Sequence, residues 1–225
     1  MRWAVQPGEA PLFGIERGCD EFEQRLLRFE GRSDARSSTD DDEVLFVLAG
    51  DARATVGDQE AELVPGTAVY IARGTEWRVE ETDGLEVLSV LVRDPLPPAG
   101  AAHAVIDADA AATGDATAGR QFRLLATPET GCASVTQFVG YIPVGRAPDH
   151  YHRYDEVVYV LEGEGRLHVD GETTRLHMGT CVHLPAGLVH CLENVGPSEL
   201  RVLGVFRPAG SPAEAYYPDG TRARY

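Results

Sequence analysis

Three histidines and one glutamate in the second half of the chain have the residue types and the spacing of a metal site. One residue separates His150 from His152, Glu156 follows four residues later, and His190 comes 34 residues after Glu156. Alternate residues of a β-strand point to the same face, so His150 and His152 can offer two imidazole nitrogens side by side. We therefore expect these two residues to form a clamp for a metal ion.

The other two candidate ligands need turns in the chain to reach the same ion. A strand rises about 3.3 Å per residue, which places Glu156 about 13 Å beyond His152, whereas metal–ligand bonds are about 2 Å long. The chain must therefore turn at 153–155, with Glu156 beginning the next strand of a hairpin. A second turn at Pro185–Gly187 precedes His190 and can deliver a third imidazole.

This donor set favours particular ions. Three neutral imidazoles and one carboxylate suit Fe, Mn, Ni, Cu or Zn better than Ca or Mg, so we expect one divalent transition metal per chain. A six-coordinate ion keeps two positions open for water, substrate or dioxygen. Open positions distinguish a catalytic metal site from a structural one.

The elements around this site are predicted to be strands. Apolar runs too short for independent helices are separated by Gly, Pro and Asp, a pattern that indicates an all-β sandwich or barrel. These runs are Val44–Leu48, Ala68–Ile71, Leu85–Val92, Val135–Ile142, Val157–Leu161 and Leu200–Phe206.

The chain also contains an internal repeat. A shift of 113 residues places Glu43–Gly50 on Glu156–Gly163, and the same shift carries Gly66 onto Gly179 and Gly74 onto Gly187. One offset kept through several motifs indicates two copies of one β-domain.

The composition between the copies sets the predicted domain boundaries. Residues 99–119 are rich in Ala, Asp and Gly, which is typical of a linker. We therefore expect an N-terminal barrel at 1–98, a linker at 99–119 that contains a solvated His103, and a C-terminal barrel at 120–225. The turn-rich segment 207–217 is expected to fold over a barrel surface.

The motifs of the second copy resemble those of the cupins. The first cupin motif, G-x5-H-x-H-x3,4-E-x6-G, is matched by His150, His152, Glu156 and Gly163, with Gly145 one residue closer than the pattern asks. The second motif, G-x5-P-x-G-x2-H-x3-N, is matched at every named position. Its matching residues are Gly179, Pro185, Gly187, His190 and Asn194.

This resemblance implies two tandem double-stranded β-helix (jelly-roll) barrels, with His150, His152, Glu156 and His190 as the metal ligands. It favours a dioxygenase that acts on a small phenolic, enediol or organic-acid substrate, with Glu156 accepting the substrate's proton. One alternative is a non-redox isomerase, lyase or decarboxylase acting on a sugar acid or keto acid. Another is a non-catalytic cupin that binds a small molecule.

The first copy has lost most of this donor set. Under the 113-residue shift, His150 falls on Ser37, His152 on Thr39 and His190 on Trp77, and the glutamate alone is kept, as Glu43. We expect no equivalent metal in the N-terminal barrel, which is then a structural domain.

Further residues are considered as lining or support. Strand parity suggests four side chains as candidates to line the second barrel: Gln137, Tyr141, Tyr154 and Val158. The remaining histidines of this copy are expected to lie in the core or on the surface, and His183 is also a candidate to support a ligand through a hydrogen bond. These residues are His168, His177 and His183.

The composition excludes several classes of function. A formal charge of −16 opposes binding to nucleic acid or to anionic membranes, and all 20 basic residues are arginine, which excludes a lysine Schiff base. The four cysteines show no paired spacing, so we expect reduced thiols. No signal-like start or membrane-length apolar run is present, which predicts a cytoplasmic location. A homodimer is a possible assembly.

Overall fold

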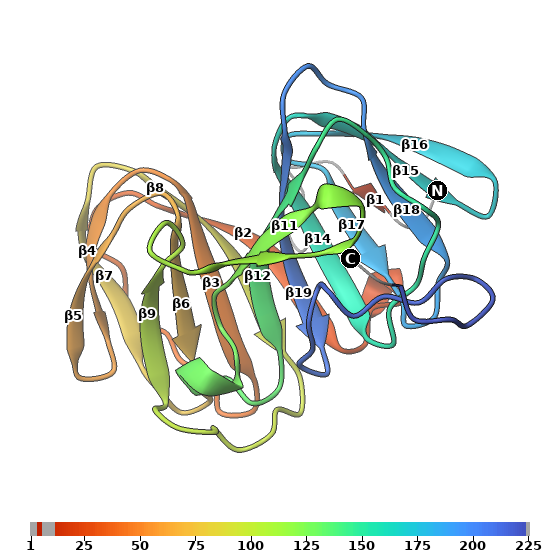
Figure 1. Ribbon diagram of the computed structural model, residues 1–225. Coiled ribbons are helices and arrows are strands. Elements are labelled where there is room, and N and C mark those ends of the chain that lie inside the picture. Colours follow the sequence, from red (N-terminus) through yellow and green to blue (C-terminus); the bar gives the residue numbers. More distant parts are fainter. Residues whose placement is uncertain (1–3, 6–11, 224–225) are drawn as a thin grey trace. The chain divides into compact units, whose positions relative to one another are not determined.

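The computed structural model of the protein describes residues 4–5 and 12–223 (Figure 1). These residues form strands and three short 3-10 helices, η1 (Ile15–Arg17), η2 (Thr117–Gly119) and η3 (Pro128–Thr130). No helix within the described ranges has the length and apolar character needed to span a membrane. The strands divide into two barrels, which confirms the predicted all-β class with two jelly-roll domains.

The N-terminal barrel is built from two antiparallel sheets. The larger has the order β2 (Phe22–Phe29), β8 (Leu85–Val92), β3 (Asp42–Ala49), β6 (Thr67–Ile71) and β9 (His103–Asp107). The smaller has the order β5 (Gln59–Leu63), β4 (Ala52–Val56) and β7 (Trp77–Thr82).

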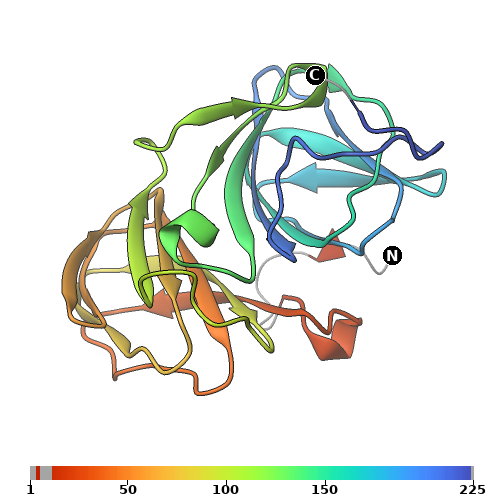
Figure 2. The same ribbon diagram turned by 60° about the horizontal axis from the view of Figure 1, so that its bottom comes forward.

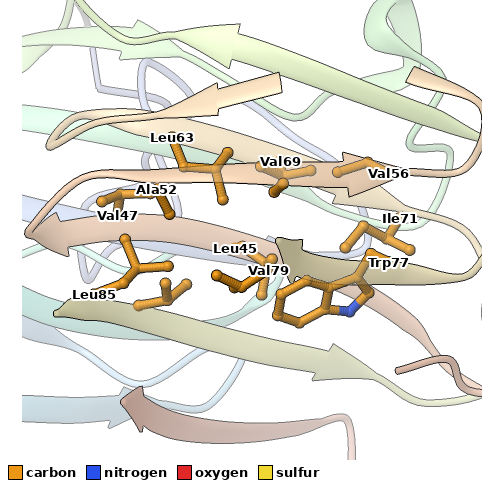
Figure 3. Close-up of a cluster of buried hydrophobic side chains, with 12 residues drawn as sticks. Leu45, Val47, Ala52, Val56, Leu63, Val69, Ile71, Trp77, Val79 and Leu85 are labelled. Carbon is orange, nitrogen blue, oxygen red and sulfur yellow. The ribbon is translucent and has the colours of Figure 1, made fainter. Parts of the chain in front are cut away.

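Apolar side chains fill the interior of this barrel. Leu45 and Val47 alternate with residues of the opposite face along β3, and they join Trp77 and Val79 of β7 in one buried cluster (Figure 3). The indole of Trp77 is 1% exposed. The end of the barrel at which the second copy carries its histidines is therefore packed in the first copy.

The C-terminal barrel also consists of two sheets. The larger has the order β1 (Ala4–Val5), β17 (Cys181–Leu184), β14 (Asp155–Glu162), β19 (Leu200–Arg207), β12 (Thr136–Ile142), β11 (Gln121–Leu124) and β10 (Thr113–Asp115). The smaller has the order β13 (Gly145–Arg146), β18 (His190–Asn194), β15 (Glu164–Val169) and β16 (Glu172–His177).

Both barrels reproduce the sequence repeat in their strand register. Glu43 pairs with Ile71 in the first barrel, and Glu156 pairs with Leu184 in the second. The two partner residues, Ile71 and Leu184, are therefore separated by the same 113 residues as the two glutamates. Both β3 and β14 carry a register irregularity at the same repeat position, between Val47 and Ala49 and between Val160 and Glu162. The repeat therefore extends to irregular features of the backbone.

The predicted linker at 99–119 is not a bare connection. Its first part forms β9, which pairs with β6 of the N-terminal barrel, and its last part forms β10 and η2 of the C-terminal unit. The composition of a segment indicates how flexible it is on its own. Whether it forms a strand also depends on an available sheet edge, and β6 offers β9 the free backbone N–H and C=O groups of such an edge. His103 is not simply solvated, because its Nε2 lies 3.2 Å from Oδ1 of Asp58.

The two units also exchange short segments of chain, so the predicted boundaries at 98 and 120 are too simple. Residues Ala112–Leu124 belong with the C-terminal unit, but Leu125–Val135 group with the N-terminal one. Near the start of the chain, Ala4 and Val5 pair with β17 of the C-terminal barrel.

Candidate metal centre

The three predicted histidine ligands lie together at one end of the C-terminal barrel. One ligand nitrogen from each of His150, His152 and His190 lies within 4.8 Å of the other two, and all three residues are buried. The ring centroids of His150 and His190 are 4.7 Å apart, and those of His150 and His152 are 5.2 Å apart. Small side-chain adjustments would place all three on one ion.

Backbone hydrogen bonds fix this arrangement. His150 and His190 form an antiparallel bridge in which each backbone N–H donates to the other's carbonyl, at 3.0 and 2.8 Å. The N–H of Gly187 donates to the carbonyl of His152 at 2.8 Å. Gly187 has φ of +78°, a left-handed conformation that favours glycine. The turn before His190 thus also positions His152.

Each imidazole is held through its Nδ1. The Nδ1 of His150 lies 3.0 Å from the carbonyl of Pro148, that of His152 lies 2.8 Å from the carbonyl of Glu214, and that of His190 lies 2.9 Å from the carbonyl of Leu188. A carbonyl only accepts hydrogen bonds, so Nδ1 must carry the proton in each ring. Nε2 then keeps its lone pair, which is how a second partner prepares a metal-binding histidine.

Burial keeps these rings neutral. It lowers the pKa of His150 to about 3 and that of His152 to about 4, and it also places the pKa of His190 well below its ordinary value. Desolvation penalises the charged imidazolium, and the neighbouring rings add to this effect at His150 and His190. Neutral rings at physiological pH are the form that binds metal.

Glu156 lines the same cavity as the histidines but lies outside their 4.8 Å group. Burial raises the pKa of its carboxyl to about 8, with Arg120 acting in the opposite direction. Among residues 4–5 and 12–223, no side chain or backbone group donates a hydrogen bond to this carboxyl. A buried carboxyl without such a donor fits a site that receives a cation.

The centre opens into a cavity of about 60 Å³. A single water needs roughly 10–15 Å³, so the cavity has room for a small molecule. Away from the histidines, the wall includes the apolar side chains of Phe122, Phe138, Phe206 and Pro212 together with polar side chains such as Gln121.

The C-terminal segment reaches this cavity, in agreement with the expectation that it folds over a barrel surface (Figure 2). Tyr216 pairs with Tyr151, and the hydroxyl of Tyr154 lies 2.9 Å from the carbonyl of Ser211 and 3.2 Å from that of Glu214. The carbonyl of Glu214 also holds His152. We call residues 211–216 the strap.

Arg120 is a cavity residue that the sequence analysis missed. Its Nη2 donates to the carbonyl of Leu192 at 2.7 Å, and its guanidinium affects the pKa of Glu156. Arg120 lies between η2 and β11, immediately after the predicted linker. A lone arginine beside such a segment carries no motif, and the cupin motifs do not include this position.

Of the predicted lining residues, Tyr141 borders the cavity, whereas Gln137, Tyr154 and Val158 do not. Val158 belongs to the apolar core below the cavity, and Tyr154 anchors the strap. Strand parity identifies the face of a side chain but not its depth in the barrel.

His183 contacts Asp155, with Nε2 and Oδ1 2.9 Å apart. The 113-residue shift maps this pair onto Tyr70 and Asp42, whose side chains also form a hydrogen bond. The pair is therefore a structural feature of both barrels. Outside the cavity, the Nε2 of His168 lies 2.8 Å from Glu193, and His177 is exposed.

The corresponding end of the N-terminal barrel is closed. Trp77 donates from Nε1 to Glu43 at 2.9 Å, and Ser89 donates to the other oxygen of the same carboxylate. The backbone of Trp77 forms an isolated β-bridge with Arg36, just as that of His190 forms one with His150. Arg36 therefore takes the place of His150 in the first barrel, whereas the 113-residue shift predicted Ser37. Apart from the histidine cluster of the second barrel, no possible metal-binding group was found among the described residues.

All four cysteines, Cys19, Cys132, Cys181 and Cys191, are buried, and they form no disulfide with one another in the structure.

Comparison with known proteins gives one family match. Residues 137–206, which include all four candidate ligands, match the cupin domain family. The match covers β12 to β19 and therefore most of the C-terminal barrel.

Several named proteins are similar to part of this chain. The tetracenomycin polyketide synthase protein TcmJ of Streptomyces glaucescens is 30% identical over 105 residues, which are 45% of this chain and 70% of that protein. The polyketide synthase CurC of Streptomyces cyaneus is 36% identical over 89 residues, covering 38% and 57% of the two chains. Quercetin 2,3-dioxygenase of Bacillus subtilis is 33% identical over 81 residues, covering 32% and 24%. The chain spans less than two thirds of the length of several curated relatives, with 62%, 57% and 56% in three of them.

Solved structures share the fold over most of the chain. Oxalate decarboxylase of Bacillus subtilis superimposes with a TM-score of 0.70 at 14% identity, covering 92% of this chain and 73% of that one. A glyoxylate-induced protein of Pseudomonas aeruginosa gives a TM-score of 0.71 at 19% identity, covering 90% and 78%. At such low identity, these likenesses concern the fold alone.

Proposed function

The chain belongs to the cupin family, and on this premise we propose that its C-terminal barrel is the centre of a metal-dependent enzyme. The proposed ligands are Nε2 of His150, His152 and His190 together with the carboxylate of Glu156. They would hold one divalent transition metal per chain: Fe, Mn, Ni, Cu or Zn. The observation that carries the proposal is the set of three Nδ1–carbonyl contacts, which leave three Nε2 lone pairs free within one cavity.

The proposed activity is of dioxygenase type on a small phenolic, enediol or organic-acid substrate. The name of one relative, quercetin 2,3-dioxygenase, supports this class of reaction. When bound, such an ion supplies Lewis-acid and redox chemistry at its open positions. Glu156 would accept the proton of a substrate hydroxyl on its carboxylate. The aromatic wall would exclude water from the substrate.

A second candidate is redox-neutral chemistry on a small organic acid, such as decarboxylation or a lyase reaction. The cationic Arg120 beside the ligands favours this candidate, because a guanidinium recognises a carboxylate by charge and shape. The fold likeness to oxalate decarboxylase is compatible with both candidates.

The N-terminal barrel is proposed to be structural and free of metal. Its glutamate already accepts hydrogen bonds from Trp77 and Ser89, and the indole occupies the interior where the second barrel has an imidazole. A cation there would have to displace packed side chains.

Metal analysis of the purified protein tests the site. We expect about one transition metal per chain, and we expect His152→Ala or His190→Ala to reduce this to nearly none. His168→Ala is the matched control, since His168 lies outside the cavity and should retain the metal. A wild-type protein with no metal after reconstitution would refute the proposed centre.

Substrate assays then separate the reactions. Oxygen uptake with catechols, flavonols, β-diketones and small organic acids would identify a dioxygenase. Turnover of an acid without oxygen consumption would instead support the redox-neutral candidate. A metal-loaded protein that binds these compounds without turning any over would be a binding protein.

A further inference from the structure

We infer that Arg120 binds a carboxylate of the substrate, so that the centre is selective for small anionic acids over neutral phenols. This inference rests on the proposed function, because it concerns the same metal-binding cavity. The proposed function does not depend on it.

The backbone holds Arg120 firmly at the cavity. Its N–H donates to the carbonyl of Thr117 at 3.3 Å, and its own carbonyl accepts from the N–H of Ala116 at 2.8 Å. The Nη2 contact with Leu192 ties the guanidinium to β18, two residues after His190. The cation is therefore positioned by the same strand that carries a metal ligand.

This guanidinium lacks a full counterion. It forms no ion pair with any residue in the described part of the chain, and its Nη2 donates a hydrogen bond to the carbonyl of Leu192. Among the described residues that border the cavity, Glu156 is the sole acidic one, and the proposed function already assigns it to the metal. A charge removed from water needs a partner of opposite sign.

Counting charges in the loaded site points to the substrate. A divalent cation, the Arg120 cation and the Glu156 anion leave an excess of two positive charges in a cavity that is lined in part by apolar side chains. A monocarboxylate or dicarboxylate would balance one or both of them. The planar guanidinium can also form two parallel hydrogen bonds to a carboxylate, which a phenol cannot accept in the same way.

The cavity also has room for such an acid. Its volume of about 60 Å³ exceeds the roughly 10–15 Å³ that a single water needs, so a molecule larger than water can enter beside Arg120. Small carboxylic acids are therefore the first ligands to test.

Calorimetry on the metal-loaded protein tests the inference with three acids and their neutral amides. The pairs are pyruvate with pyruvamide, malonate with malonamide, and succinate with succinamide. At least one acid should bind wild type more tightly than its amide. Arg120→Gln should weaken binding of that acid by roughly 10- to 100-fold, the usual effect of a hydrogen bond to a charged group, and should change amide binding by less than about threefold. Arg120→Lys should give an intermediate affinity for the acid, since lysine keeps the positive charge but cannot form the two parallel hydrogen bonds of a guanidinium.

Arg166→Gln is the matched control, because Arg166 lies on β15, is half exposed and does not border the cavity. Metal content is measured on every variant first. A wild type without metal contradicts the proposed function, whereas a loaded wild type that prefers no acid to its amide contradicts only this inference. Acid binding that survives Arg120→Gln, or loss of the metal from that variant, would also overturn it.

Discussion

The three histidines owe their readiness for a metal to atoms that no ligand motif names. Carbonyls of Pro148, Leu188 and Glu214 hold the three Nδ1 atoms, and two of these carbonyls lie two residues before the histidine that they hold. Local backbone geometry thus sets two of the rings, while a distant segment sets His152. All three end in the same protonation state.

At the residue scale, proton release on metal binding reports on Glu156. With a pKa of about 8, its carboxyl is mostly protonated at pH 7 in the metal-free protein and mostly ionised at pH 9. Metal binding should therefore release close to one proton at pH 7 and much less at pH 9, and affinity should rise with pH until about pH 8. His150 and His152 contribute little there, because their pKa values of about 3 and 4 keep them neutral.

Calorimetry in two buffers of different ionisation enthalpy measures this number of protons. Glu156→Gln removes the titrating group and serves as the control, so its proton release should be near zero at both pH values. Equal release by wild type at pH 7 and pH 9 would show that Glu156 does not lose a proton to the metal.

The sequence was sufficient to predict that His150, His152 and His190 lie together, because their spacing encodes two hairpins. The role of these residues and of Glu156 as metal ligands stays a prediction. The sequence was not sufficient for Arg120, whose role depends on the turn at Thr117 bringing it under β18. It also misjudged Tyr154 and Val158, because parity along a strand does not tell how deep a side chain lies in a barrel.

At the scale of elements, the strap connects the C-terminal segment to the metal site. One carbonyl, that of Glu214, lies within hydrogen-bond reach of both Nδ1 of His152 and the hydroxyl of Tyr154. The ring of Tyr154 also stacks on His152, with centroids 5.6 Å apart. The strap therefore acts on the site through the orientation of His152.

Tyr154→Phe tests this connection, because it keeps the ring and removes the hydroxyl that holds the strap. We expect metal affinity to fall by roughly 2- to 10-fold, the effect of one ordinary hydrogen bond, with the fold retained. Titration with a metal-sensitive dye measures the change. Tyr151→Phe is the control, since Tyr151 meets Tyr216 through its ring and backbone. An affinity unchanged by Tyr154→Phe would mean that the strap does not position His152.

The elements also show where composition misleads. The Ala-rich, Asp-rich and Gly-rich stretch at 99–119 was expected to be a linker, yet its residues complete sheets in both barrels. In the first copy, the 113-residue shift holds along β3 but slips by one residue in the preceding loop, where Arg36 pairs with Trp77. Strands keep their register through pairing, whereas loops tolerate length changes.

At the scale of the whole molecule, the two barrels share a backbone plan but differ at one end. The matching irregularities and registers show the common plan, while Trp77 lies in a packed interior and His190, at the corresponding position, lies in the proposed metal site. Metal should therefore stabilise the second barrel directly.

Hydrogen exchange followed by mass spectrometry tests this difference. A metal at 100 times its dissociation constant stabilises its domain by about 2.7 kcal/mol, which corresponds to roughly 100-fold slower exchange through domain opening. We expect this slowing in peptides that cover β14 and β18, and little change in those that cover β3 and β7. Equal slowing in β3 and β7 would show that the first barrel also responds to the metal.

The most direct test of the metal site is an anomalous difference map from crystals of the metal-loaded protein, measured at the absorption edge of the bound element. We predict one peak per chain, in the C-terminal barrel, about 2.0–2.2 Å from Nε2 of His150, His152 and His190, with Glu156 turned towards it. No peak at these nitrogens, or a second peak beside Glu43 in the N-terminal barrel, would contradict the account.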